Sequence, residues 1–393
     1  MAKKILIIGF LDSIHTARWV SQLEGQGWDI HLFPSIRGES VHPSMANVTV
    51  YHFFHSERLS PERDLNQVAE SQFAIWADRF RTHVFDKHFP MYRAKQLKRV
   101  IGRLKPDVIH SLEIQTAGYL ALETKKLFGG EFPRWLVTNW GSDIYLFGRL
   151  HNHRQKIGEV LANCDYYSCE CERDAKLARE FGFEKKILPV FPNAGGFDLA
   201  ILKEQRNQID PSDRRLIMLK GYQHWAGRAL AGLRALERCA DLLSGYEIVI
   251  YSAMPDVALA AELFSEKTGI PVRVPPQKLP HKEIMALHAR ARISIGLSIS
   301  DAISTSLLEA MVMGSFPIQS CTACAEEWIE HGVSGMIVPP EDPDIIEMAI
   351  RAALSDDKLV DQAALINWRT AEDRLDATRL RQKAINLYET VWE

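Results

Sequence analysis

Residues 291–314 read ARISIGLSISDAISTSLLEAMVMG, and they combine an apolar run, a polar loop and a second apolar segment. The run at 291–297 is typical of a buried strand. The hydroxyl residues 304–306 then offer N-caps for a helix that Gly314 would end. In an α/β sheet, this order of strand, loop and helix places ligand-binding groups at the carboxyl end of the strand. The stretch therefore predicts an α/β fold with a binding site at this loop.

Two acidic residues, Asp301 and Glu309, stand eight positions apart in this stretch. Asp301 falls in the predicted loop, and Glu309 falls in the first turn of the predicted helix. Ser306 and Glu309 have the spacing of a capping box, in which Glu309 would only stabilise the helix start. The other interpretation is that both acids face a ligand, and the residues alone leave the two interpretations open.

Residues 306–344 resemble the donor-site signature of retaining glycosyltransferases of family 4. The shared features are the spacing of Asp301 and Glu309, an LEAM segment at 308–311 and a GxxGxxVPPxD turn at 332–342. The resemblance implies that Glu309 binds the ribose of a nucleotide-sugar and that Asp301 contacts the transferred sugar. Family 4 usually has Glu at the position of Asp301, so the side chain here is shorter by one methylene group.

The resemblance implies a GT-B fold, in which two Rossmann-like, doubly wound domains face each other across a cleft. We expect an acceptor-binding domain at 1–205, a nucleotide-sugar-binding domain at 206–372, and a terminal helix at 373–393 that packs back on the first domain. The implied activity is transfer of a sugar from a nucleotide-diphosphate sugar to a hydroxyl acceptor, with retention of configuration. The acceptor would be a glycan, a lipid-linked group or a small molecule, as in polysaccharide biosynthesis. No metal or cofactor is implied.

The first half resembles the family at residues 13–19 (SIHTARW), 105–110 (KPDVIH) and 192–198 (PNAGGFD). Where family members often have an HGxD motif, this chain has Trp140 followed by Gly, Ser and Asp143. Trp140 therefore replaces the usual catalytic His. Asp143 remains and would hold an acceptor hydroxyl, or it would cap a turn.

The second half contains the polar loop KGYQHWAGR at 220–228, which follows a predicted strand and precedes a predicted helix. Bases and a glycine at a helix N-terminus suit a pyrophosphate. Family 4 has an Arg where this chain has Lys220, and its later Lys is absent here, so Arg228 is the nearest base. An ordinary charged surface loop is the alternative. The expected catalytic residues are Lys220, Arg228, Asp143 and Asp301, and the expected donor-binding residues are Glu309, Ser304, Thr305, Ser306, Leu308, Gly221, His224 and Pro276.

The composition of the 393 residues is typical of a soluble enzyme, and a net charge of -3 gives no general attraction to nucleic acid. The apolar run at 5–8 is too short for a signal peptide, and the chain has no apolar run of about 18 residues. We therefore expect a cytoplasmic protein. Neither the pair Cys169/Cys171 nor the pair Cys321/Cys324 has a flanking His, and the C-x-C spacing of the first is not usual for zinc, so we expect reduced cysteines.

Residues 87–105 interleave bases with apolar side chains. Such a segment can lie on an anionic membrane surface, and peripheral membrane contact is one expectation. The alternative is a helix that faces the core and carries its bases on the outer side.

Three other functions stay open. A sugar-nucleotide epimerase of the same fold would share the donor site and would release an altered nucleotide or a free sugar without any acceptor. A catalytically weak partner subunit would still bind nucleotide, and Trp140 favours that interpretation. A dinucleotide-binding oxidoreductase is disfavoured, because the turn at 9–15 lacks a GxGxxG pattern.

Overall fold

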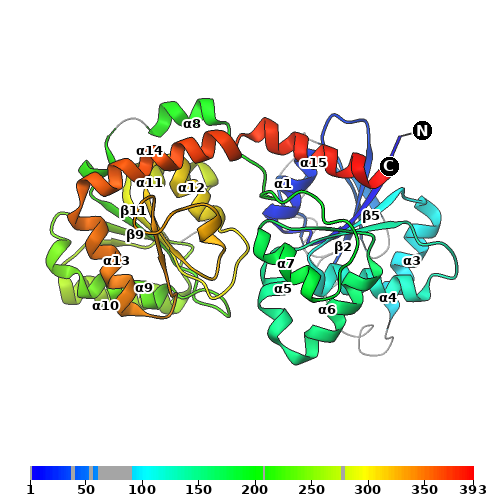
Figure 1. Ribbon diagram of the computed structural model, residues 1–393, viewed down its shortest axis with the longest axis horizontal. Helices are drawn as coiled ribbons and strands as arrows, with labels where there is room; N and C mark the ends of the chain where they lie inside the picture. Colours follow the sequence, from blue (N-terminus) through cyan, green and yellow to red (C-terminus); the bar gives the residue numbers. More distant parts are fainter. Residues whose placement is uncertain (1, 37–39, 53–55, 61–90, 207–208, 276–278) are drawn as a thin grey trace. The chain divides into compact units, whose positions relative to one another are not determined.

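The computed structural model describes the chain except for residues 1, 37–39, 53–55, 61–90, 207–208 and 276–278 (Figure 1). The chain forms two compact units. The first comprises Met1–Gly195 together with Thr378–Glu393, and the second comprises Gly196–Ala377. Among the described residues, no helix is long and apolar enough to cross a membrane.

The described part of the first unit contains a seven-stranded sheet in the order β4-β3-β2-β1-β5-β6-β7. Its central strand, with the sequence KILIIG, buries five of its six residues. All neighbouring strands are parallel except β3 and β4. The strands are β1 (Lys4–Gly9), β2 (Asp29–Pro34), β3 (Thr49–Tyr51), β4 (Ser56–Arg58), β5 (Val108–Leu112), β6 (Arg134–Thr138) and β7 (Tyr166–Ser168).

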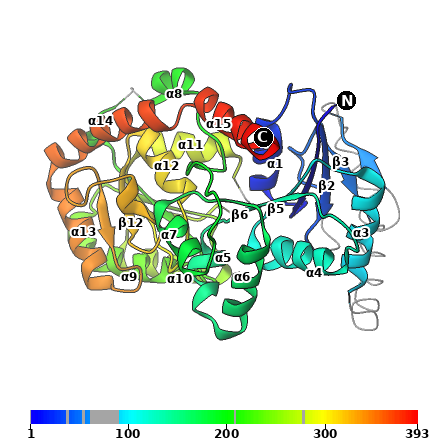
Figure 2. The same cartoon turned by 45° about the vertical axis from the view of Figure 1, so that its right-hand side comes forward.

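Helices cover both faces of this sheet, with α3, α4 and α6 on one face and α1 and α15 on the other (Figures 1 and 2). The helices are α1 (Ile14–Gln22), α3 (Tyr92–Leu104), η1 (Ile114–Gly118), α4 (Tyr119–Leu127), α5 (Ser142–Tyr145), η2 (Phe147–Arg149), α6 (His151–Asn163), α7 (Glu172–Glu180) and α15 (Ala377–Trp392). The expected terminal helix is thus present, and its side chains pack in the first unit. Tyr388 of α15 is fully buried there beside Trp19 and His110.

The second unit contains, in its described residues, a six-stranded parallel sheet in the order β10-β9-β8-β11-β12-β13. The chain crosses from one side of the sheet to the other between β8 and β11, which is the point where ligands bind in doubly wound folds. The strands are β8 (Leu216–Lys220), β9 (Glu247–Tyr251), β10 (Val272–Arg273), β11 (Ala291–Gly296), β12 (Phe316–Ser320) and β13 (Met336–Val338).

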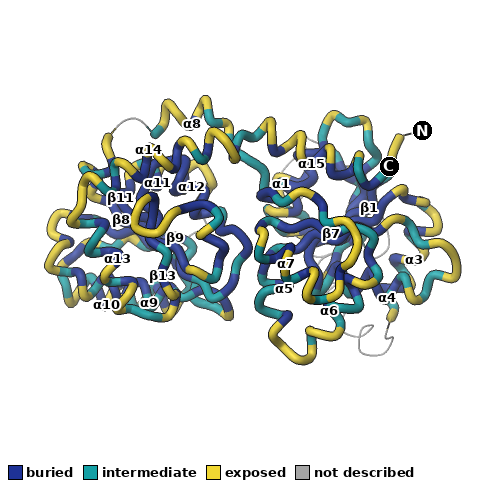
Figure 3. Tube along the Cα trace, viewed as in Figure 1, coloured by how far each residue is buried: buried dark blue, intermediate teal, exposed yellow. Residues whose placement is uncertain are grey.

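The helices α9, α10 and α13 cover one face of the second sheet, and α8, α11, α12 and α14 lie over the other (Figure 1). Their bounds are α8 (Leu199–Arg206), α9 (Ala229–Arg238), α10 (Pro255–Thr268), α11 (His281–Arg290), α12 (Thr305–Met313), α13 (Pro343–Ser355) and α14 (Asp357–Arg374). In both units the buried residues follow the strands (Figure 3). The prediction of two doubly wound α/β domains is confirmed.

The units divide at 195/196 and 377/378, whereas the sequence suggested 205/206 and 372/373. One reason is that α8 packs on the second unit, where Arg206 donates to the carbonyl oxygen of Ala364 at 3.0 Å. The two connecting segments also run side by side within that unit. The Phe197 N–H donates to Leu375 O at 2.8 Å, and a Cβ at Gly196 would lie 2.4 Å from that oxygen. Only glycine fits at position 196.

Candidate functional site

The loop between β8 and α9 turns tightly at the carboxyl end of the central strand. A Cβ at Gly221 would lie 2.5 Å from Ala253 Cα, and one at Gly227 would lie 2.3 Å from Tyr222 O. A hydrogen bond within the loop also stabilises this turn, because His224 Nδ1 accepts the N–H of Ala226 at 3.1 Å. The loop is therefore a fixed structure, and both glycines are needed for its shape.

Two cations flank this loop in different ways. The Lys220 ammonium lies 4.6 Å from the ring centroid of Tyr222 and has no acidic partner among the described residues. Burial, Lys220 and Arg228 all lower the pKa of His224. This loop of the second unit is thus electropositive, as an anionic ligand requires.

Arg228 is held by other groups of the second unit. Its Nε donates to Glu341 Oε1 at 2.6 Å, and its Nη1 donates to Gly227 O at 2.8 Å. Nη1 also donates to the carbonyl of His224 at 3.3 Å. The guanidinium therefore binds its own loop and an acid that is 63% exposed. A ligand anion would have to compete with Glu341 for it.

The loop after β11 contacts the loop at 220–228, since the Ile299 N–H donates to Ala226 O at 2.9 Å, and α12 begins where this β11 loop ends. Its N-cap is Ser304, whose hydroxyl lies 2.8 Å from that of Ser306 instead of capping the backbone. The first amides of a helix have no intrahelical acceptors, so they can bind an anion. Thr305 is half-buried at this start, while Leu308 is buried in the core.

Asp301 lies in the loop between β11 and α12 and is half-buried. Its Oδ1 accepts the N–H of Ala302 at 2.9 Å, and its own N–H donates to Thr322 O at 3.3 Å. The backbone of this acid is thus fixed by the neighbouring loop, at the carboxyl edge of the sheet where the sequence placed it.

Glu309 does not cap its helix, so the capping-box interpretation is wrong. The helix starts one residue before Ser306, and Glu309 lies well inside it and is 6% exposed. Its Oε1 pairs with His281 Nε2 at 2.8 Å, and its Oε2 lies 3.7 Å from His288 Nε2. Burial alone would raise the pKa of Glu309, but the two histidines outweigh burial and lower it to about 2. Glu309 is consequently a buried carboxylate that stays ionised.

In the first unit, Asp143 is 4% exposed and its oxygens are occupied by backbone amides. Oδ1 accepts the Trp140 N–H at 2.9 Å, and Oδ2 accepts the Ile114 N–H at 3.1 Å. Burial and the Glu113 carboxylate raise the pKa of Asp143 well above its ordinary value. Of the two roles that the sequence suggested, the contacts favour the turn cap.

The turn that Asp143 holds presents an aromatic group at the carboxyl edge of the first sheet. The Trp140 ring lies 5.6 Å from that of His15 and 6.0 Å from that of Phe10. Phe10 follows β1, His15 lies in the first turn of α1, and Trp140 follows β6. The sequence identified the segment 13–19 and the Trp140 position separately and gave no sign that the rings of His15 and Trp140 lie together.

Four residues that interact with the candidate groups were not predicted from the sequence: His281, His288, Glu341 and Glu113. The seven-residue spacing of His281 and His288 puts both on one face of α11, and this signal was available. Glu341 follows the prolines of the VPPxD turn and gave no signal. Glu113, with a backbone φ of 80°, could not be foreseen as strained. Pro276, expected near the nucleotide base, lies outside the described residues.

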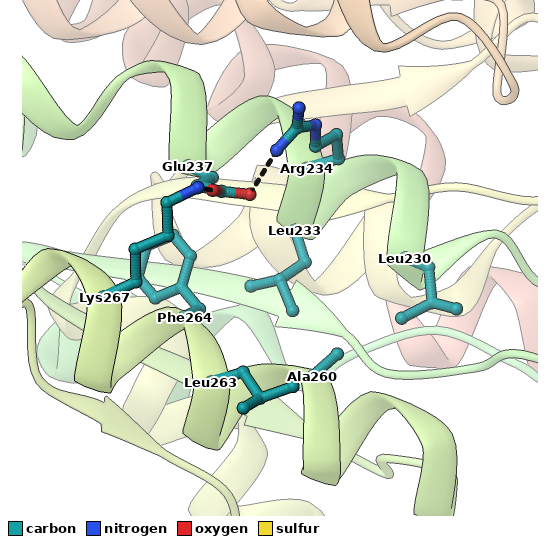
Figure 4. Close-up of a pocket in the computed structure, with 8 residues that line it drawn as sticks. All are labelled: Leu230, Leu233, Arg234, Glu237, Ala260, Leu263, Phe264 and Lys267. Carbon is teal, nitrogen blue, oxygen red and sulfur yellow. Dashed lines mark hydrogen bonds and ion pairs between the residues drawn. The ribbon is translucent and has the colours of Figure 1, made fainter.

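A hollow of about 240 Å³ lies on the outside of the second unit between α9 and α10 (Figure 4). It is lined mainly by apolar side chains, and its polar rim is already paired, since Glu237 accepts from Arg234 at 2.7 Å. Its lining residues are Leu230, Leu233, Arg234, Glu237, Ala260, Leu263, Phe264 and Lys267. It shares no residue with the candidate site and offers little to a charged ligand.

Two known families match the sequence. The family described as Glycosyl transferase 4-like matches residues 4–168, and Glycosyl transferases group 1 matches residues 261–365. No curated protein matches the chain.

Solved structures match over nearly the full length, at identities that show the fold alone. One is HepE from Anabaena in complex with UDP and glucose, with a TM-score of 0.69, 12% identity and coverage of 99% of this chain and 100% of that one. Another is sucrose-phosphate synthase from Thermosynechococcus elongatus, with a TM-score of 0.66, 14% identity and 99% of both chains covered. A third is an E. coli protein described as trehalose-6-phosphate bound with UDP-2-fluoro glucose. It has a TM-score of 0.67, 13% identity and coverage of 100% and 99%.

Proposed function

Because the chain belongs to the GT-B glycosyltransferases of group 1, we propose that it transfers a sugar from a nucleotide-diphosphate sugar to a hydroxyl acceptor with retention of configuration. The observation that carries the proposal is Glu309. It is a buried carboxylate, ionised by two histidines, on the helix that begins at the crossover edge of the second sheet. A ribose offers two hydroxyl donors, which is the chemistry that such a carboxylate accepts.

The leaving nucleoside diphosphate needs stabilisation of its developing negative charge. Lys220 would provide it, and two observations support this role: its ammonium has no acidic partner among the described residues, and the residue ends β8 directly before the glycine loop. The helix start at Ser304 adds amide N–H groups. Arg228 joins them when the diphosphate displaces Glu341. No metal and no cofactor takes part in this scheme.

In a one-step transfer, retention means that the acceptor hydroxyl attacks from the face that the diphosphate leaves. Asp301, in the β11 loop, is the proposed contact to the transferred sugar. In the first unit, the aromatic group of Trp140 and His15 is the proposed acceptor surface, and Asp143 positions it through the Trp140 amide. Neutral acceptor sugars stack on aromatic rings, so this surface suits a glycan.

A thermal-shift panel with UDP-glucose, GDP-mannose and ADP-glucose tests the proposal. A ligand at about 100 times its Kd adds about 2.7 kcal/mol to the free energy of unfolding, which is a clear rise in Tm. We expect one nucleotide class to raise Tm. Glu309→Gln should weaken the affinity for that nucleotide-sugar roughly tenfold or more, since a hydrogen bond to a charged group contributes about 1.5–3 kcal/mol.

The matched control is Glu266→Gln, an exposed acid on α10, which should bind as the wild type does. If no nucleotide-sugar changes Tm, the proposal is wrong. If a nucleotide-sugar does bind, retention is tested by NMR: an α-linked donor should give a product whose anomeric signal is that of the α-linkage.

A second candidate, a catalytically weak partner subunit, is favoured by Trp140 in the position where the family often has His. Such a subunit would bind the nucleotide in the thermal-shift panel and yet release no nucleoside diphosphate with any acceptor. An epimerase would be recognised by an altered nucleotide-sugar in the absence of acceptor.

A further inference from the structure

His281 is the first residue of α11, and its imidazole reaches across to α12. Its Nε2 lies 2.8 Å from Glu309 Oε1, and its side chain is 45% exposed, whereas that of Glu309 is 7% exposed. The two helices lie side by side in both ribbon views (Figures 1 and 2). One imidazole at the surface thus holds a carboxylate that is almost completely buried.

The other oxygen of this carboxylate is held less firmly. His288 Nε2 lies 3.7 Å from Glu309 Oε2, which is too far for a hydrogen bond. This ring nitrogen of His288 has no hydrogen-bond partner among the described residues. The opposite ring nitrogen of His288 is fixed by the Ser294 hydroxyl at 2.9 Å. The Tyr251 ring packs edge-on against His288 at 6.1 Å. Oε1 is therefore clamped, while Oε2 keeps most of its accepting capacity.

We infer that His281 is a positioning residue for the nucleotide: it fixes the plane of the Glu309 carboxylate so that Oε2 and the remaining lone pair of Oε1 receive the two ribose hydroxyls. The inference rests on the proposed function. Without His281, the carboxylate can rotate about its last torsion, which is broad for Glu. The cost falls on nucleotide binding and not on the chemical step, because the ribose is remote from the reacting carbon and is bound equally in ground and transition states.

The test uses His281→Ala, His281→Gln and, as a matched control, His151→Ala, an exposed histidine at the start of α6. The probes are UDP, GDP or ADP, whichever stabilises the wild type most, and its 2′-deoxy analogue, with Kd measured by calorimetry. We expect His281→Ala to weaken the ribonucleotide about tenfold with kcat within about twofold. His281→Gln, whose amide N–H also donates, should recover most of the affinity.

The ratio between ribonucleotide and 2′-deoxynucleotide affinity is the decisive measurement. A positioning role predicts that this ratio shrinks in His281→Ala, because a rotated carboxylate no longer accepts hydrogen bonds from both ribose hydroxyls. A merely structural role would weaken both nucleotides by the same factor, and that outcome overturns the inference. If the wild type binds no nucleotide, the proposed function itself fails. If Glu309→Gln loses binding while His281→Ala does not, only the inference fails.

Discussion

Acid should weaken the first unit through one buried histidine, His110. Its Nδ1 lies 2.7 Å from the Tyr388 hydroxyl, and its Nε2 lies 2.6 Å from Thr138 Oγ1. The Tyr388 hydroxyl accepts the Trp19 indole N–H at 2.9 Å, and we assign its own proton to the bond with Nδ1. His110 is thus neutral, with its proton on Nε2. A second proton would leave the Tyr388 hydroxyl without an acceptor.

The magnitude follows from the pKa. Burial lowers the pKa of His110 from 6.5 to about 3. The folded pKa is depressed, so the stability that the neutral ring contributes is present above the unfolded pKa of 6.5 and is lost as pH falls toward 3. Between about pH 7 and about pH 5, the unfolded chain gains a proton that the folded one does not. The free energy of unfolding should therefore fall by about 2 kcal/mol from this group alone.

The assay is urea unfolding of the wild type and His110→Gln at both pH values, with tryptophan fluorescence as the probe. The variant is less stable at neutral pH, but its stability should fall by about 2 kcal/mol less on acidification. His151→Gln, at an exposed site, should keep the wild-type dependence. An equal fall in wild type and His110→Gln, or an NMR titration of the His110 ring near its ordinary pKa, would refute the reasoning.

Three further outcomes test the site and the surface. Replacing Lys220 and Arg228 together by Ala should lower turnover by about 100-fold or more with an unchanged fold, and activity within about threefold of wild type would end their proposed role. Glu341→Gln should tighten diphosphate binding about two- to fivefold, because an exposed ion pair that holds Arg228 contributes about 0.2–1 kcal/mol; unchanged or weaker binding in calorimetry would contradict this. Vesicles of anionic lipid should retain the protein at low salt and release it at high salt. Changing the exposed bases of α3 to Glu should abolish this retention, and failure of the wild type to sediment would leave α3 as a domain helix.

The exposed and buried faces of α3 bear on the experiment with anionic vesicles. Its bases at 95, 98, 99 and 103 are exposed, while Ala94, Leu97 and Ile101 are buried against α4. The described part of the predicted basic stretch is therefore a helix that faces the core. A membrane would meet only its charges, since its apolar side is already covered. The residues at 87–90 lie outside the described part.

The sheet was predictable because buried parallel strands leave long apolar runs. The run at 291–297 became β11, and the polar loop and helix after it followed as expected. The site was less predictable, because spacing along the chain does not show which partner a side chain selects. Ser306 and Glu309 have the spacing of a capping box, yet the helix begins before Ser306 and Glu309 pairs with His281. Arg228 was assigned to a phosphate, yet a distant acid in the sequence, Glu341, pairs with it.

The packing of α15 in the first unit has a consequence for synthesis on the ribosome. Residues 1–195 emerge first, but the Tyr388 ring that completes their core follows only after the whole second unit has been translated. At about 5–20 residues per second, the nascent unit waits roughly 10–40 s with the Trp19 indole and the His110 ring uncovered. Chaperones have that interval in which to bind it. A chain that stops before Tyr388 would keep this surface exposed to the proteases that remove incompletely folded proteins, even though every residue of the second unit is present.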